Sequence, residues 1–95
     1  MFVSILKGKI KYDPIIKKIN EDTVINFVLE PISKPNSSEV RNLVRCSINI
    51  NNVENQADFE KGKILFIKGT SSNISYNNGP YTFHVMVNYY EVVEE

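Results

Sequence analysis

Hydrophobic and polar residues alternate over two long runs near the C-terminus, Lys63–Tyr76 and Tyr81–Val93. The segment between them, Asn-Asn-Gly-Pro, favours a chain reversal, so the runs predict the two strands of a β-hairpin. One face of this hairpin carries Leu65, Ile67, Gly69, Phe83, Val85 and Val87. The other face carries Ile64, Phe66, Lys68, His84, Met86 and Asn88. Because both faces are partly apolar, we expect a curled sheet that closes on its own core and leaves an outer face for a partner or ligand.

The same alternation predicts three strands upstream of the hairpin. They span Phe2–Tyr12, Thr23–Pro31 and Asn42–Ile50. Their inward residues are expected to be Leu6, Gly8, Ile10, Ile25, Phe27, Leu29, Val44, Cys46, Ile48 and Ile50. Gly8 stands where a sheet that closes into a barrel must bend sharply, because glycine permits close backbone approach.

The segments between these strands are less regular. Residues 15–22 mix isoleucine and lysine without a clean period, which favours a bend leading into a turn at Asn20–Asp22. Residues 32–40 are rich in serine and asparagine and are typical of a flexible loop. In residues 51–61, a pair of asparagines able to cap a helix precedes Val53 and Ala57, which are four residues apart. This segment predicts one short helix.

Length and composition favour one small intracellular domain. The chain has 95 residues, of which 42% are hydrophobic and 23% are charged, so it can bury one core and no more. No apolar run is long enough to cross a membrane, and the first residues lack the pattern of a signal peptide. The single cysteine, Cys46, alternates with inward residues and is expected to be buried rather than reactive. We therefore expect a cytoplasmic protein with no membrane partner.

The predicted order of elements is strand, strand, strand, short helix, strand, strand. This is the order of an OB-fold, a five-stranded Greek-key barrel. The sequence therefore predicts an all-β class: a five-stranded OB-fold barrel with one short helix between strands three and four, occupying residues 1–95 as a single domain.

Several short motifs resemble the bacterial single-stranded DNA-binding protein family. They are Leu-Lys-Gly-Lys-Ile-Lys-Tyr-Asp-Pro at 6–14, Asn-Phe-Val-Leu-Glu at 26–30, Phe-Glu-Lys-Gly at 59–62, Ile-Lys-Gly at 67–69 and Tyr-Thr at 81–82. Each motif is moderately specific, and their order and spacing strengthen the likeness. Within the family the sequence is most similar to the branch of PriB, the primosomal replication protein N, on account of Phe-Val-Leu-Glu at 27–30.

The resemblance implies a non-enzymatic protein that binds single-stranded DNA in replication, restart or repair, as PriB-like and SSB-like members do. It also implies a homodimer in the bacterial cytoplasm, associated with the nucleoid, with replication or restart proteins as partners. RNA remains an alternative ligand. A different function is an OB-fold adaptor that binds a replication protein and has little affinity of its own for nucleic acid. The formal charge of zero and the uncharged segment 71–78 favour this alternative.

Binders of single-stranded nucleic acid combine a basic groove with aromatic side chains on which bases stack. The chain has no tryptophan. The candidate nucleic-acid-binding residues are Lys9, Lys11, Arg45, Lys68 and Tyr76. Ordinary solvated charges and a solvent-facing tyrosine are the alternatives for these positions. The outward file of the third strand, with Arg45 and Ser47, is polar enough to meet water or a polar ligand.

Two further positions have other expected roles. Ile64 and Phe66 lie on the outward file of the fourth strand, where exposed apolar side chains favour a dimer interface over a base platform. Tyr12, beside Asp13-Pro14, is assigned to packing.

The sequence contains no pattern typical of an enzyme. His84 is the only histidine, and no second ligand type stands near it at a metal spacing, so a structural or surface role is expected. The acidic pair Glu94-Glu95 lies at the terminus, away from any predicted pocket. The four glycines are scattered and form no phosphate-binding loop. We expect no catalytic residue, no metal and no cofactor.

Overall fold

The computed structural model describes residues 2–32, 43–75 and 81–93. Within these ranges the chain forms six strands and two single turns of 3-10 helix. The strands are β1 (Phe2–Ile10), β2 (Ile15–Ile19), β3 (Asp22–Pro31), β4 (Val44–Asn49), β5 (Ile64–Ser75) and β6 (Tyr81–Val93). The 3-10 helices, η1 (Ile50–Asn52) and η2 (Gln56–Asp58), connect β4 to β5.

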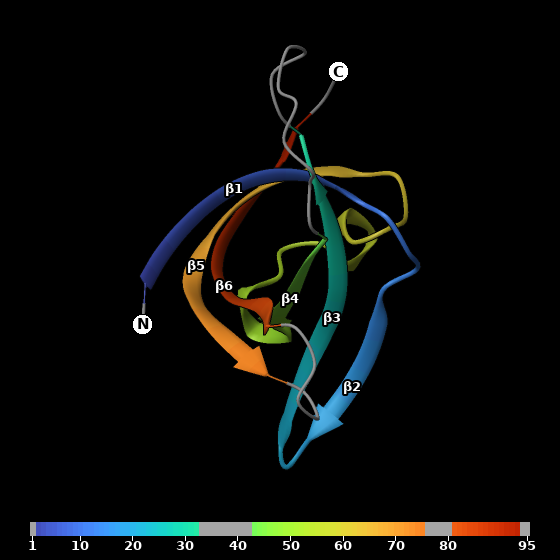
Figure 1. Ribbon diagram of the computed structural model, residues 1–95. Helices are drawn as coiled ribbons and strands as arrows, with labels where there is room; N and C mark the ends of the chain where they lie inside the picture. Colours follow the sequence, from blue (N-terminus) through green and yellow to red (C-terminus); the bar gives the residue numbers. More distant parts are fainter. Residues whose placement is uncertain (1, 33–42, 76–80, 94–95) are drawn as a thin grey trace.

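Five of these strands close into a barrel (Figure 1). They follow the order β1-β5-β6-β4-β3, and a second pairing of β1 with β3 joins the two ends of the row. This join is formed by Gly8–Ile10 of β1 and Leu29–Pro31 of β3. The pairing of β4 with β6 is parallel, whereas the other barrel pairings are antiparallel. The predicted all-β class with a five-stranded OB-fold barrel is confirmed.

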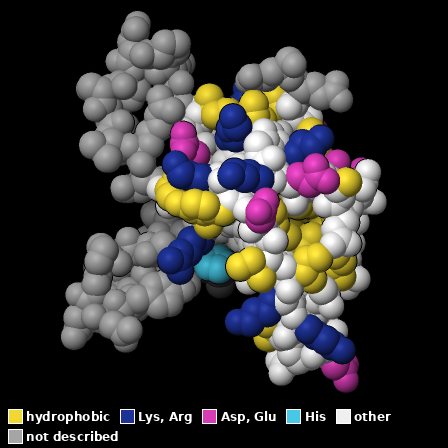
Figure 2. Space-filling view, turned by 90° about the vertical axis from the view of Figure 1, so that its right-hand side faces the viewer, with side chains coloured by type: hydrophobic (Ala, Val, Ile, Leu, Met, Phe, Trp, Pro, Cys, Tyr) yellow, Lys and Arg dark blue, Asp and Glu magenta, His cyan; other side chains and the backbone are white. Residues whose placement is uncertain are grey.

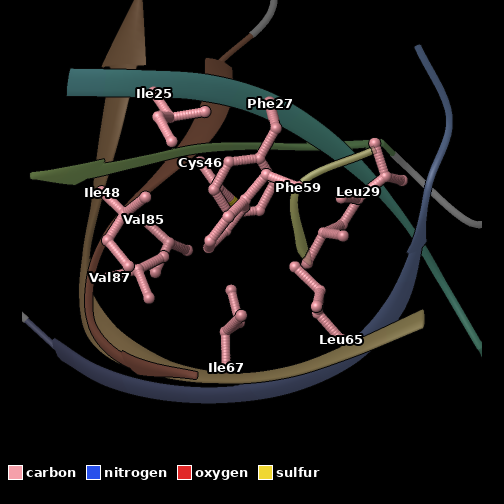
Figure 3. Packing of buried hydrophobic residues seen from close by; sticks show 11 residues of the cluster. Ile25, Phe27, Leu29, Cys46, Ile48, Phe59, Leu65, Ile67, Val85 and Val87 are labelled. Atoms are coloured by element: carbon pink, nitrogen blue, oxygen red, sulfur yellow. The ribbon is translucent and has the colours of Figure 1, made fainter. Parts of the chain in front are cut away.

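The core fills the barrel with side chains from all five of its strands (Figure 3). The buried members are Ile10, Ile25, Phe27, Leu29, Cys46, Ile48, Phe59, Leu65, Ile67, Val85 and Val87. Apart from Phe59, all of these are residues that the alternation predicts to point inward. Phe59 follows η2, and its ring lies between the rings of Phe27 and Tyr90, with centroid distances of 5.2 and 4.7 Å. It therefore joins the segment after η2 to aromatic side chains of β3 and β6.

Two glycines permit close contacts between neighbouring strands. Gly8 lies at the join of the barrel, where a Cβ atom would stand 2.9 Å from the backbone oxygen of Glu30. At Gly69 a Cβ atom would stand 2.2 Å from the backbone oxygen of Met86, next to a register shift between β5 and β6. A side chain at either position would push the strands apart, so these glycines allow the sheet to coil tightly.

Residues 15–19 form a strand, so the prediction of an irregular bend over residues 15–22 is wrong in part. Strand β2 pairs with β3 in a hairpin whose two-residue turn contains Asn20, with φ of 56°. Asparagine tolerates this left-handed conformation better than most residues. The hairpin extends beyond the barrel (Figure 1), and all five residues of β2 are exposed. Because β2 buries no side chain, the sequence carries no alternation by which to recognise it.

The single short helix predicted in residues 51–61 is replaced by two separate 3-10 turns. The side chain of Asn49 caps η1 by accepting a hydrogen bond from the backbone N–H of Asn51. The side chain of Asn55 caps η2 in the same way, through the N–H of Ala57. Between the two turns the backbone is extended at Val53, which ends η1. Two asparagine caps six residues apart therefore start two turns instead of one continuous helix.

Some predictions concern residues outside the described ranges. The loop at 32–40 lies outside them from residue 33 onward, as does Tyr76. In the described part of the chain, no helix has the length and apolar character that crossing a bilayer requires.

Candidate nucleic-acid interface

A groove of about 530 Å³ crosses the outer surface where β2, β3, β4 and β6 meet. We call it the outer groove. Its lining residues are Tyr12, Asp13, Ile15, Lys17, Asn26, Phe27, Val28, Arg45, Cys46 and His84. The register explains how distant parts of the sequence meet here. Asn26 pairs with Ile15 on one side and with Ser47 on the other, and Arg45 pairs with Val28 and with His84.

The outer groove combines an aromatic ring with two basic side chains. Tyr12 is 53% exposed, so its ring is available to a ligand, and its assignment to packing is wrong. Lys17 comes from β2 and Arg45 from β4, and both side chains are exposed at the groove. Figure 2 views this side of the molecule, with the imidazole of the only histidine lying among basic and hydrophobic side chains. Asp13 is the one acidic residue that lines the groove.

Three polar side chains are hydrogen-bonded beneath the groove. The hydroxyl of Ser47 donates to Oδ1 of Asn26 over 2.6 Å, and its oxygen lies 3.0 Å from Nε2 of His84. Ser47 is only 6% exposed, whereas Asn26 and His84 are half-buried and line the groove. Burial is the main cause that lowers the pKa of His84, and the nearby positive charge of Arg45 lowers it further. The imidazole is therefore neutral at pH 7.

The distance between Ser47 and His84 is also that of a nucleophile and its general base. Among the residues that the structure describes, the other parts of a hydrolase site do not accompany this pair. The proton of Ser47 is given to an amide oxygen, and the buried hydroxyl does not line the groove. Among the described residues no carboxylate makes a hydrogen bond with the other ring nitrogen of His84. The arrangement is that of a fixed polar surface.

A second depression of about 640 Å³ adjoins the outer groove at Tyr12, which lines both. We call it the lysine depression. It is lined by Lys9, Ile10, Lys11, Tyr12, Glu30, Lys61 and Gly62. Lys11 is not a simple solvated charge, because its Nζ lies 2.9 Å from Oε2 of Glu30. This hydrogen-bonded ion pair raises the pKa of Lys11. Glu30 therefore competes with any phosphate for the charge of Lys11.

The predicted binding residues thus fall into three groups. Arg45 lines the outer groove, and Lys9 and Lys11 line the lysine depression. Lys68 lies on a different wall of the barrel, where β5 places it between Ile5 of β1 and Tyr89 of β6. Tyr76 lies outside the described residues.

This different wall, which we call the β1–β5–β6 face, carries many apolar side chains. Val3 and Ile5 are 73% and 62% exposed, and Met86 and Tyr89 are each 48% exposed. The predicted interface residues Ile64 and Phe66 lie on the same outward side of β5 and are half-buried. In the described part of the chain, β3 covers the other edge of β1 over Gly8–Ile10 alone.

The far end of β6 is acidic instead of basic. There the hydroxyl of Tyr90 donates to Oδ2 of Asp58 over 2.8 Å and accepts from the backbone N–H groups of Glu54 and Asn55. The neighbouring hydroxyl of Tyr89 donates to Glu91, and this bond is the main cause that raises the pKa of Tyr89. The contacts of Tyr90 hold the loop with η1 and η2 against the barrel. The loop between β4 and β5 and the end of β6 thus carry acidic side chains, whereas most of the charged residues that line the outer groove and the lysine depression are basic.

Comparison with known proteins identifies the architecture. No protein-family model matches the sequence, and no curated protein sequence matches it. Solved structures do match over nearly the whole chain. The N-terminal domain of PriB from Thermoanaerobacter tencongensis, described as dimeric, has a TM-score of 0.73 and 23% identity, and the match covers 98% of this chain and 97% of that one. The chain has an OB-fold.

Two further OB-fold structures show the same likeness at lower sequence identity. The small single-stranded DNA-binding protein from Streptomyces coelicolor has a TM-score of 0.76 and 10% identity, covering 97% of this chain and 92% of that one. The SSB of Plasmodium falciparum, solved in complex with single-stranded DNA, has a TM-score of 0.67 and 17% identity, covering 99% and 96%. The likeness to PriB and SSB proteins is thereby confirmed for the fold.

Several residues of the outer groove are not among the candidates predicted from the sequence. Tyr12 and Lys17 belong to the segment around β2, whose strand the alternation did not reveal. Asn26 is predicted only as part of the motif at 26–30, and His84 only as a residue with a structural or surface role. The signal in the sequence that could have indicated these residues is the polar outward file of β4. Ser47 on that file contacts both Asn26 and His84 at hydrogen-bond distance.

Proposed function

We propose that this protein binds single-stranded DNA without catalysis, along a path that joins the outer groove to the lysine depression. The observation that carries the proposal is the position of Tyr12, whose exposed side chain lines both concavities. The outer groove also contains the basic residues Lys17 and Arg45, and the lysine depression contains Lys9. Bases stack on exposed aromatic rings, while basic side chains contact the phosphates between them. Two proteins of similar structure support the same function: the small single-stranded DNA-binding protein of Streptomyces coelicolor and the Plasmodium falciparum SSB in complex with single-stranded DNA.

The mechanism has an electrostatic part that depends on salt. Each phosphate contact releases counterions, and for single strands the slope of log K against log salt is about −0.7 per contact. Lys17 and Lys18 provide a matched pair for a test. They are neighbours on β2 with side chains on opposite faces, and only Lys17 lines the outer groove. Each substitution by glutamine removes one positive charge, so the two single variants have the same net charge.

The test is fluorescence anisotropy with labelled oligo-dT over a range of salt concentrations. Lys17→Gln is expected to make the slope less steep by about 0.7, and Lys18→Gln is expected to leave it unchanged. Tyr12→Leu is expected to weaken binding by about 1–3 kcal/mol at unchanged slope, because stacking releases no counterions. Equal effects of Lys17→Gln and Lys18→Gln would argue against this path. Absence of binding at about 50 mM salt would refute the function itself.

The second candidate function is an adaptor that binds a replication or restart protein. Two observations favour it: the formal charge is zero, and Glu30 holds Lys11 in an ion pair. The double variant Lys9→Glu/Lys11→Glu separates the two functions. A DNA-binding protein loses affinity for oligo-dT in this variant, whereas an adaptor retains its protein partner in a pull-down.

A homodimer through the β1–β5–β6 face is part of the proposal. Its support is the exposure of Val3 and Ile5 on the face whose β5 strand also carries Ile64 and Phe66, together with the dimeric PriB domain of similar fold. Ile5→Glu is expected to yield monomers in size-exclusion chromatography with light scattering, because it places a charge on the apolar face. Ile19→Glu is the control, since Ile19 is 48% exposed on β2, away from this face. A dimer that survives Ile5→Glu places the interface elsewhere.

The cellular setting follows from this function. We propose a cytoplasmic, nucleoid-associated protein of one OB-fold domain that acts in replication, restart or repair, with Tyr76 as an additional contact to the nucleic acid. Lys68, the other predicted contact, lies on the β1–β5–β6 face, so a dimer through that face removes it from the path of the strand. RNA is the alternative ligand. Competition between oligo-dT and oligo-U for the labelled complex distinguishes the two.

A further inference from the structure

One ring nitrogen of His84 is open to solvent at the outer groove. The other, Nε2, lies 3.0 Å from the hydroxyl oxygen of Ser47, whose own proton is donated to Oδ1 of Asn26. Because a hydroxyl has one proton, Nε2 of the neutral imidazole is the donor to Ser47, and Nδ1 carries no proton. Nδ1 makes no hydrogen bond with the described residues, among which no buried side-chain nitrogen or oxygen lacks a partner. It therefore reaches solvent, in a residue that lines the groove.

This imidazole can gain a proton without losing its contact to Ser47. The added proton goes to Nδ1, while the N–H at Nε2 continues to donate to the hydroxyl oxygen. Two causes oppose the gain and lower the pKa of His84: burial, which is the larger, and the positive charge of Arg45. The neutral form at pH 7 is therefore set by the surroundings of the ring and not by a hydrogen bond that protonation would break.

The charges near His84 come from β4 and from the segment around β2. Arg45 of β4 is paired with His84 in the parallel ladder, so the two side chains project from the same face of the sheet. The segment around β2 contributes Tyr12, Asp13 and Lys17 to the lining of the same groove. The lining residues from β3 carry no charge, and the residue of β5 that pairs with His84 is Ser72. Two basic residues and one carboxylate thus share the groove with the imidazole.

A phosphate bound beside Arg45 counteracts both causes that lower the pKa of His84. One of its oxygens accepts a hydrogen bond from a proton on Nδ1, and its negative charge offsets the positive charge of Arg45. A neutral His84 offers nothing to the same oxygen, because phosphodiester oxygens only accept hydrogen bonds and Nδ1 then has no proton to donate. Phosphate binding and protonation of His84 therefore favour each other, and by equal amounts.

We propose that His84 contacts a phosphate of the bound strand beside Arg45 and takes up one proton as it does so, so that the protein holds single-stranded DNA more tightly in mildly acidic solution. This inference rests on the proposed binding of single-stranded DNA. It adds to Lys17 and Arg45 a third cation of the outer groove, one whose charge depends on the pH.

The experiment measures affinity for labelled oligo-dT by fluorescence anisotropy at about pH 8 and about pH 5.5, on either side of the ordinary histidine pKa. Neither thymine nor the phosphodiester gains or loses a proton in this range, and His84 is the only histidine of the chain. A neighbouring opposite charge shifts a pKa by about one unit or more, and one unit corresponds to about tenfold in affinity. We expect binding to be about five- to tenfold tighter at the lower pH, with a salt slope steeper by about 0.7.

His84→Gln is the decisive variant, because its amide N–H can still donate to Ser47 but the side chain cannot gain a proton. Lys18→Gln is the control, since it removes a charge outside the outer groove and retains the imidazole. The tightening at low pH is expected to be lost in His84→Gln and kept in Lys18→Gln. Circular dichroism at both pH values verifies that each protein is folded.

Tightening in folded His84→Gln equal to that of the wild type overturns the inference, because another group then takes up the proton. Wild-type affinity that does not change with pH overturns it too and leaves the proposed function standing. Wild-type protein that binds oligo-dT at neither pH refutes both.

Nuclear magnetic resonance follows the imidazole in the wild-type protein and needs no variant. With one histidine in the chain, its ring signals are unambiguous. The pKa of His84 is expected to lie below 6.5 in the free protein and to rise by about one unit when the protein is saturated with oligo-dT. A pKa that is unchanged or lower in the complex overturns the inference.

Discussion

Substitution of Gly69 by alanine tests the close approach of β5 and β6. An added Cβ would lie 2.2 Å from the backbone oxygen of Met86 and 2.9 Å from Cγ1 of Val85. Ordinary carbon contacts are about 3.5–4.0 Å, so the strands must separate by about 1 Å or more at this point. Overpacking of this kind costs about 1–3 kcal/mol, and loss of a ladder hydrogen bond adds about 1 kcal/mol. We expect Gly69→Ala to lower the free energy of unfolding by about 3 kcal/mol.

The assay is equilibrium unfolding in urea, followed by circular dichroism at one fixed protein concentration, because dimerisation would make stability concentration-dependent. Gly62→Ala is the matched control. Gly62 has φ of 93°, but no atom lies within 4 Å of its added Cβ, so only backbone strain of about 1 kcal/mol is expected. A loss at Gly69 no greater than the loss at Gly62 would show that the strands are not packed as closely as described.

Three further predictions concern single side chains. Burial raises the pKa of the Cys46 thiol from 9.0 to about 12, so the native protein should not react with a thiol reagent at pH 8, whereas the urea-unfolded protein should. The pKa of His84 is lowered in the folded state, so the unfolded chain binds more protons below about pH 6.5 and the free energy of unfolding should fall as the pH decreases. His84→Gln should remove that part of the pH dependence, and an identical pH profile would contradict the assignment. Tyr90→Phe, which loses the hydrogen bond to Asp58, should cost about 1 kcal/mol in urea unfolding, and a neutral result would mean that this bond does not hold the loop.

The barrel strands could be predicted because their inward faces must fill one closed core. This requirement produces an alternation of apolar and polar residues that can be recognised in the sequence, as around Phe27, Cys46 and Val85. Strand β2 could not be recognised in the same way, since none of its five residues is buried. The helix prediction failed because Asn49 and Asn55 each cap a separate turn, a choice that local spacing alone does not reveal.

The candidate site was less predictable than the fold. Arg45 could be proposed from the polar outward file of β4, but its neighbours in the groove come from distant parts of the sequence. Tyr12 and His84 line the same groove only because β3 pairs with β4 and β4 pairs with β6. A register of this kind depends on the closure of the whole barrel. The proton arrangement around Ser47 likewise requires three strands to be in place.

The β2–β3 hairpin has a consequence for how the protein tolerates change. Its outer strand contributes no side chain to the core, and its tip turns at Asn20 beyond the barrel wall. Chain added or removed at such a tip alters loop closure by only about 0.6 kcal/mol for each doubling of length. The length of this hairpin and the stability of the barrel are thus set by different parts of the sequence. The β2–β3 hairpin can therefore be lengthened without redesigning the core that supports it.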